Sequence, residues 1–199
     1  MTDDADDLSP QEQIMEATFR TLQTHGFSAT SISKIAEESG KSKATLYHHY
    51  DDKEDLLGDF LGFLLDRLEA ELDDVDPEDP RDHLLGLIDL LLPPDMDDEA
   101  SQFRRAILEI RSQAPYHETY RAQFERSDEL FLAELVAVIE RGIEEGRFRA
   151  VDAEEAAEFV FSAAYGAVER GVTLEDPDVV ERNRTVVREY VESQLLRYA

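Results

Sequence analysis

Residues 31–50 read SISKIAEESGKSKATLYHHY. Thr30 or Ser31 is suited to cap a first short helix that ends at Glu38, since a side-chain oxygen there accepts from the free amides of the first turn. Gly40 follows in a tight turn, because glycine adopts the left-handed backbone conformation at low cost. Ser42 then caps a second short helix that ends at residue 50. The stretch therefore predicts two short helices joined by a glycine turn.

The flanking segments add a longer helix on each side. Ser9-Pro10-Gln11-Glu12 forms a capping box with proline at the first helical position, and an apolar face begins directly after it. This first helix is expected to end at His25-Gly26. On the other side, Asp51-Asp52 precedes a long apolar helix over residues 53–74. The three helices before residue 51 together predict a helix-turn-helix unit.

The rest of the chain also predicts helices. Apolar residues recur three and four positions apart between the prolines, and sustained alternation is absent. We expect an all-α protein of about nine helices. We divide it into a disordered acidic tail (1–8), a helix-turn-helix domain (9–52) and a larger helical domain (53–199).

Composition excludes several classes of site. The 199 residues include 47 acidic and 20 basic side chains, a net charge of -27, and no cysteine. Without cysteine there are no disulfides, thiolate metal sites or zinc fingers. The acidic N-terminus and the lack of a long apolar run predict a soluble, cytoplasmic protein with no membrane partner. We expect no metal, no cofactor and no enzyme activity.

The charge is unevenly distributed. All four lysines, Lys34, Lys41, Lys43 and Lys53, fall within twenty residues, and residues 25–50 carry three lysines against two glutamates. Basic residues on a DNA-binding surface neutralise phosphates. The abundance of acids, with sixteen arginines to four lysines, is typical of a cytoplasm that holds molar salt. We therefore expect a halophilic protein whose DNA binding has a shallow salt dependence.

The second short helix has two distinct faces. At 100° per residue, Leu46 and Tyr50 share an apolar side, whereas Ala44, Thr45 and His48 lie opposite. In a helix-turn-helix the second helix enters the major groove, where such side chains can contact bases. Hydroxyl, ammonium, phenol and imidazole groups on the flanks can bind phosphates. The expected DNA contacts are Thr30, Ser31, Lys41, Ser42, Lys43, Ala44, Thr45, Tyr47, His48, His49 and Lys53.

The order of these residues matches a known pattern. The matching positions are Gly26-Phe27, Thr30-Ser31-Ile32, Ile35-Ala36, Gly40, Ser42 to Tyr50 and Lys53 to Leu57. Over roughly residues 10–60 the chain resembles the N-terminal domain of TetR-family transcriptional regulators. The resemblance implies a phosphate clamp at Lys53 and contacts from Lys43, Ala44, Thr45, Tyr47, His48 and His49. It also implies a homodimer that represses transcription from a palindromic operator and releases it when a small molecule binds the C-terminal domain.

The C-terminal helices are expected to hold the effector and the dimer interface. The resemblance implies a small-molecule effector, and the apolar C-terminal domain suggests that this effector is apolar or amphipathic. Carboxylates such as Glu109 or Glu169 could instead select a cation. The pocket residues are Phe60, Leu64, Phe103, Ile107, Ile110, Tyr120, Phe124, Phe131 and Tyr165, with ordinary core packing as the alternative. The dimer residues are Ala156, Val160, Ala163, Ala167, Val180, Val187, Val191 and Leu195, again with internal core as the alternative.

Two other functions remain open at this point. An acidic all-α module could use the helix-turn-helix surface to bind a protein rather than DNA. A helical enzyme is the weaker alternative, because the sequence carries no phosphate loop and no nucleophile motif. If the chain is a regulator, helix 53–74 is expected to link effector binding to DNA binding.

Overall fold

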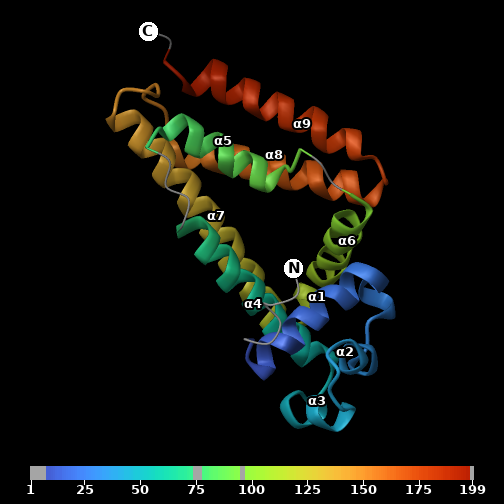
Figure 1. Ribbon diagram of the computed structural model, residues 1–199. Helices are drawn as coiled ribbons and strands as arrows, with labels where there is room; N and C mark the ends of the chain where they lie inside the picture. Colours follow the sequence, from blue (N-terminus) through green and yellow to red (C-terminus); the bar gives the residue numbers. More distant parts are fainter. Residues whose placement is uncertain (1–7, 74–77, 95–96, 198–199) are drawn as a thin grey trace. The chain divides into compact units, whose positions relative to one another are not determined.

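The computed structural model describes residues 8–73, 78–94 and 97–197 (Figure 1). Within these ranges the regular secondary structure is helical, apart from an isolated bridge between Phe148 and Leu196. The all-α prediction is thus confirmed, whereas the acidic tail falls largely on residues 1–7, outside the described part. The elements are α1 (Pro10–Ala29), α2 (Ile32–Glu38), α3 (Lys43–His49), α4 (Lys53–Asp73), α5 (Pro80–Leu91), α6 (Asp98–Gln113), η1 (Ala114–Tyr116), α7 (Glu118–Glu144), α8 (Ala153–Thr173), α9 (Pro177–Tyr190) and the π-helical turn η2 (Val191–Leu195).

The helices form two compact units. Unit 1 extends to Leu68 and resumes over Asp97–Phe124, so it contains α1 to α3, most of α4, α6, η1 and the start of α7. Unit 2 comprises the described residues within 69–96 and 125–199, chiefly α5, most of α7, α8 and α9. The boundary expected between residues 52 and 53 lies inside unit 1.

Side-chain caps start the helices of the N-terminal region. Ser9 accepts from the amide of Glu12, and the Glu12 carboxylate accepts from the amide of Ser9, which completes the predicted capping box. Ser31 caps α2 and Ser42 caps α3 in the same manner. Gly26 has φ of 71° and interrupts the helical conformation of α1 where its end was expected. Each cap satisfies amides that have no partner within the helix.

The core of unit 1 joins α1 and α4 to α6. The Phe19 and Phe103 rings lie 4.5 Å apart, and Phe60 meets Phe103 edge-on at 6.4 Å. A Cβ atom added to Gly26 would come within 2.8 Å of the Gln102 side chain, so α6 lies close against the end of α1. The helix-turn-helix segment therefore packs on a helix some eighty residues further along the chain.

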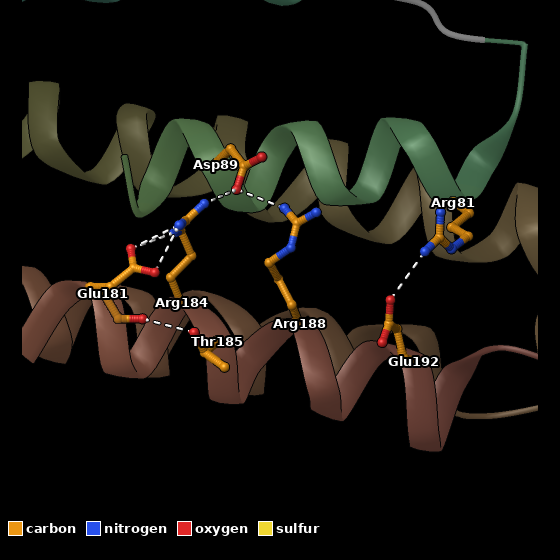
Figure 2. Close-up of polar contacts among 7 residues, drawn as sticks. All are labelled: Arg81, Asp89, Glu181, Arg184, Thr185, Arg188 and Glu192. Carbon is orange, nitrogen blue, oxygen red and sulfur yellow. Dashed lines mark hydrogen bonds and ion pairs between the residues drawn. The ribbon is translucent and has the colours of Figure 1, made fainter. Parts of the chain in front are cut away.

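Unit 2 is held together by apolar packing and by ion pairs. α8 packs along α9, and α5 contacts both. Figure 2 shows Asp89 of α5 between two arginines of α9: its Oδ1 is 2.7 Å from Arg188 Nη1 and 3.4 Å from Arg184 Nη1. Glu181 also accepts from Arg184 at 2.7 Å. The carboxylate of Asp89 thus fixes α5 against α9.

Among the residues that the structure describes, none of the helices has the length and apolar composition of a membrane-spanning segment.

Candidate nucleic-acid interface

Helix α3 has one buried face and one exposed face, as its helical projection predicts. Leu46 and Tyr50 are buried, and Tyr47 is 57% exposed. Lys43, Ala44, Thr45, His48 and His49 are exposed as well. The exposed face of this short helix therefore carries a small side chain together with hydroxyl, imidazole and ammonium groups.

Tyr50 holds the end of α3 in place. Its ring lies in the core of unit 1, and its hydroxyl interacts with Asp59 of α4 and Gln11 of α1. Burial, followed by the nearby charge of Asp59, raises the pKa of Tyr50 to about 12. The phenol remains neutral at physiological pH, and it ties α3 to the two neighbouring helices.

The cap of α3 also orients Thr45. Ser42 Oγ accepts from the Thr45 amide at 3.1 Å and lies 2.8 Å from the Thr45 hydroxyl. Both side chains are exposed. Ser42 therefore holds the hydroxyl of Thr45 at the N-terminal end of α3, the end that contacts base edges in helix-turn-helix proteins.

Two of the predicted phosphate-binding lysines have partners inside unit 1. Lys41 Nζ donates to Gln13 Oε1 at 2.9 Å. Lys53 Nζ donates to the Phe27 carbonyl at 2.8 Å and lies 3.9 Å from the Phe27 ring centroid. Partial burial lowers the pKa of Lys53, against the opposing effect of Glu54 and Glu109. Each ammonium keeps two further N–H donors for a phosphate, and the existing hydrogen bond limits where the group can reach.

The structure corrects the assignment of Thr30. Its side chain is 4% exposed, and its Oγ1 donates to the Gly26 carbonyl at 2.7 Å. Thr30 thus closes the turn after α1 instead of facing DNA, because a hydroxyl so near a free carbonyl bonds locally. Its neighbour Ser31 is half-buried and caps α2.

The predicted pocket residues fall into two groups. Unit 1 holds seven of them: Phe60, Ile110, Tyr120 and Phe124 are buried, and Leu64, Phe103 and Ile107 pack on the same core. Phe131 and Tyr165 lie in unit 2, where both are neighbours of the Phe161 ring, at 6.2 and 6.3 Å. The Tyr120 hydroxyl and Gln123 Oε1 are buried and have no hydrogen-bond partner among the described residues.

The residues predicted for a dimer interface also require correction. Except for Ala163, which is half-buried, they are buried within the chain: Ala156, Val160, Ala167, Val180, Val187, Val191 and Leu195. An apolar stripe on one helix is first covered by the helices beside it, here α8, α9 and α5.

A different apolar face of the same two helices remains uncovered. Phe159 of α8 is 49% exposed, Val186 of α9 is 60% exposed, and the Tyr190 ring lies 4.5 Å from that of Phe159. Sequence reasoning missed these residues because they lie among charged neighbours. The spacing of Val186 and Tyr190, four apart on α9, was the available signal.

Comparison with known proteins identifies the family. Residues 14–59 match the profile described as bacterial regulatory proteins, tetR family, and residues 80–196 match the C-terminal domain of BetI-type transcriptional repressors. A TetR transcription regulator from Haloarcula marismortui is 41% identical, with 94% of this chain and 98% of that chain covered and a TM-score of 0.85. The transcriptional repressor AcnR of Corynebacterium glutamicum is 26% identical, over 70% of this chain and 69% of its own.

A more distant structure shares the fold. It is a putative transcriptional regulator from Saccharomonospora viridis in complex with choline, 23% identical, with a TM-score of 0.77 over 94% of this chain and 98% of its own. The two profiles together span most of the chain, and the helix-turn-helix lies within the first of them. The chain belongs to the TetR family of DNA-binding transcriptional regulators.

Proposed function

We propose that the protein is a homodimeric repressor that binds a palindromic operator through α3 and releases it when a small apolar or amphipathic effector binds. The observation that carries the DNA-binding role is the outward set on α3: Lys43, Ala44, Thr45, Tyr47, His48 and His49 are all exposed. Leu46 and Tyr50 hold the opposite face in the core. An operator on the chromosome requires the protein to act in the cytoplasm.

The side chains of α3 suit different parts of a duplex. Ala44 allows close approach and can contact a thymine methyl group, whereas Thr45 and His48 can hydrogen-bond to base edges. Lys43, Tyr47 and His49 stand where they can bind phosphates and fix the position of the helix. Base contacts give specificity, and phosphate contacts give affinity.

The experiment begins with duplexes selected by the full-length protein from random DNA in molar KCl. Fluorescence anisotropy on the selected duplex then compares the wild type with Thr45→Ala and Tyr47→Ala. Loss of one such contact is expected to weaken binding about tenfold or more. Tyr116→Ala is the matched control, since Tyr116 is 83% exposed in η1 and lies outside α3. If selection enriches no sequence, the surface does not read DNA, and a protein partner becomes the better assignment.

The proposed dimer uses the uncovered face of α8 and α9. Phe159, Val186 and Tyr190 form an apolar surface that a second copy would cover in a four-helix bundle. A palindromic operator requires the two α3 helices of a dimer to stand about one helical turn of DNA apart, roughly 34–36 Å. Phe159→Glu and Val186→Glu should give monomers in size-exclusion chromatography with light scattering. Leu90→Glu, on α5, should remain dimeric; if all three variants are dimeric, the interface lies elsewhere.

The proposed release step uses α4, which belongs to unit 1 up to Leu68 and to unit 2 beyond it. One continuous helix can transmit a displacement from the C-terminal domain to the helix-turn-helix segment. The match to BetI-type repressors and the choline complex of a structural relative support a ligand-responsive C-terminal domain. The test is operator affinity with and without a bound effector; equal affinities would contradict the coupling.

A further inference from the structure

Arg104 differs from most arginines of this chain in lacking a partner. Its guanidinium makes no hydrogen bond, ion pair or ring contact with any residue that the structure describes. Arg170, on α8, shares this property but is exposed, so water solvates its charge. Arg104 is half-buried on α6, and this burial lowers the pKa of its side chain. A cation is thus held partly away from water without a compensating charge.

Arg104 lies on α6 beside residues that pack on the apolar core of unit 1. Its neighbour Phe103 contacts Phe19 and Phe60, and Ile107, one turn further along α6, packs on the same core. Arg111, seven residues on and therefore on the same side of the helix, lies 4.9 Å from the centroid of the Phe124 ring. Arg104 consequently projects from the side of α6 that, two turns further on, faces α7.

An unpaired, partly buried guanidinium destabilises a fold, because its lost hydration is not replaced. Carboxylates are abundant in this chain, which has 47 acidic residues, yet none of the described ones pairs with Arg104. Other arginines of unit 1 have one: Arg20 pairs with Glu38, and Arg67 pairs with Glu16. An unfavourable charge that remains without a partner is characteristic of a binding site.

We infer that Arg104 binds the carboxylate of an amphipathic effector whose apolar part lies against Phe103 and Ile107. This inference rests on the proposed ligand response and specifies its chemistry. A guanidinium recognises a carboxylate with two parallel hydrogen bonds. Two polar atoms of α7 in the same unit, the Tyr120 hydroxyl and Gln123 Oε1, are buried and also have no hydrogen-bond partner among the described residues. They could form further hydrogen bonds with the effector.

The carboxylates considered for a cationic effector are less suitable. Glu169 is exposed on α8. Glu109 lies near enough to Lys53 to favour the charged form of that lysine. Its carboxylate therefore already interacts with a cation within unit 1. An anionic effector therefore fits this chain better than the choline bound by the Saccharomonospora viridis relative.

The first test needs no ligand. Arg104→Met keeps much of the side-chain volume and removes the unpaired charge, so the free protein should melt at a temperature higher by roughly 3 °C. Arg170→Met, which removes an equally unpaired but exposed charge, should leave the melting temperature unchanged. An unchanged or lower melting temperature for Arg104→Met would mean that the arginine has a structural role, and would overturn the inference.

The second test uses three probes on the full-length protein at constant KCl concentration: octanoate, octan-1-ol and choline. Calorimetry should show that the wild type binds octanoate at least about tenfold more tightly than octan-1-ol or choline. Arg104→Met should lose this preference, Arg104→Lys should retain part of it, and Arg170→Met should behave as the wild type. Preference for choline, equal binding of octanoate and octan-1-ol, or no binding of octanoate would each overturn the inference.

Operator binding separates this inference from the proposed function. Arg104→Met should bind the selected duplex with wild-type affinity in the absence of octanoate, since Arg104 lies on α6 and not on α3. If the wild type binds no specific duplex, the proposed function fails, and the octanoate measurements still decide the role of Arg104.

Discussion

Lys53 Nζ donates a hydrogen bond to the Phe27 carbonyl at 2.8 Å, and the same ammonium group lies 3.9 Å from the centroid of the Phe27 ring. The first residue of α4 is thereby attached to the segment that follows the bend of α1 at Gly26. A charged hydrogen bond and a cation–π contact on one side chain act together. Lys53 thus fixes the start of α4 relative to the segment before α2.

Lys53→Gln should lower the free energy of unfolding by about 2 kcal/mol, because both contacts to Phe27 are lost. Urea denaturation in KCl measures this change. Lys43→Gln is the control, since exposed Lys43 should affect operator affinity but not stability. Equal stability of the two variants would show that Lys53 serves only as a phosphate ligand.

Tyr50 should give the protein a stability loss at alkaline pH. Its pKa is raised to about 12 from a usual value of 10.0, so the folded state favours the neutral phenol. The unfolded state ionises first, and the contribution of Tyr50 is therefore full below pH 10 and lost as the pH rises toward 12. Urea titrations between pH 9 and 12 should show a smaller loss for Tyr50→Phe. At pH 8 this variant should be less stable by about 1 kcal/mol, because the hydroxyl loses its interactions with Asp59 and Gln11; identical pH profiles would contradict the assignment.

Asp89 should matter more to stability than an ordinary surface acid. Asp89→Asn weakens the interaction with both Arg184 and Arg188 of α9, and a loss of about 1 kcal/mol is expected because the site is partly exposed. Glu140→Gln, an exposed position on α7, should change the stability little. Urea denaturation at fixed KCl compares the two variants. A result for Asp89→Asn within the error of the control would mean that apolar packing alone holds α5 to α9.

Operator binding should persist in molar KCl with a shallow salt dependence. At this ionic strength the Debye length is about 3 Å, so the acidic body of the protein scarcely repels DNA. The chain has four lysines, all between residues 34 and 53, so few cations are available to release counterions from phosphates. Anisotropy between 1 and 3 M KCl should give a log–log slope of about −2 or shallower. A slope near −10, as for a strongly basic repressor, would contradict the prediction.

Local signals account for most of what the sequence predicted correctly. Ser9, Ser31 and Ser42 start their helices because a cap requires only residues three or four apart. The two faces of α3 follow from the helical period, so Leu46 and Tyr50 were recognisable as core.

The errors arose where a side chain had a choice of partners. Thr30 bonds to the Gly26 carbonyl, which the sequence did not distinguish from a capping or DNA-contact role. The stripe from Val180 to Leu195 was correctly read as apolar, but periodicity does not tell which helix covers it. The unpaired state of Arg104 depends on neighbours that the fold brings together from distant segments, and no local pattern encodes it.

The packing of α1 on α6 limits how this regulator could be recombined with others. Phe19 lies against Phe103, and Gly26 lies against Gln102, so a fragment cut at residue 52 would expose apolar surface that α6 normally covers. A chimera that joins residues 9–52 to a foreign sensor domain would need a helix equivalent to α6, with an aromatic residue at the position of Phe103. In this chain the DNA-binding segment and α6 share one core, so each depends on the other for the burial of its apolar side chains.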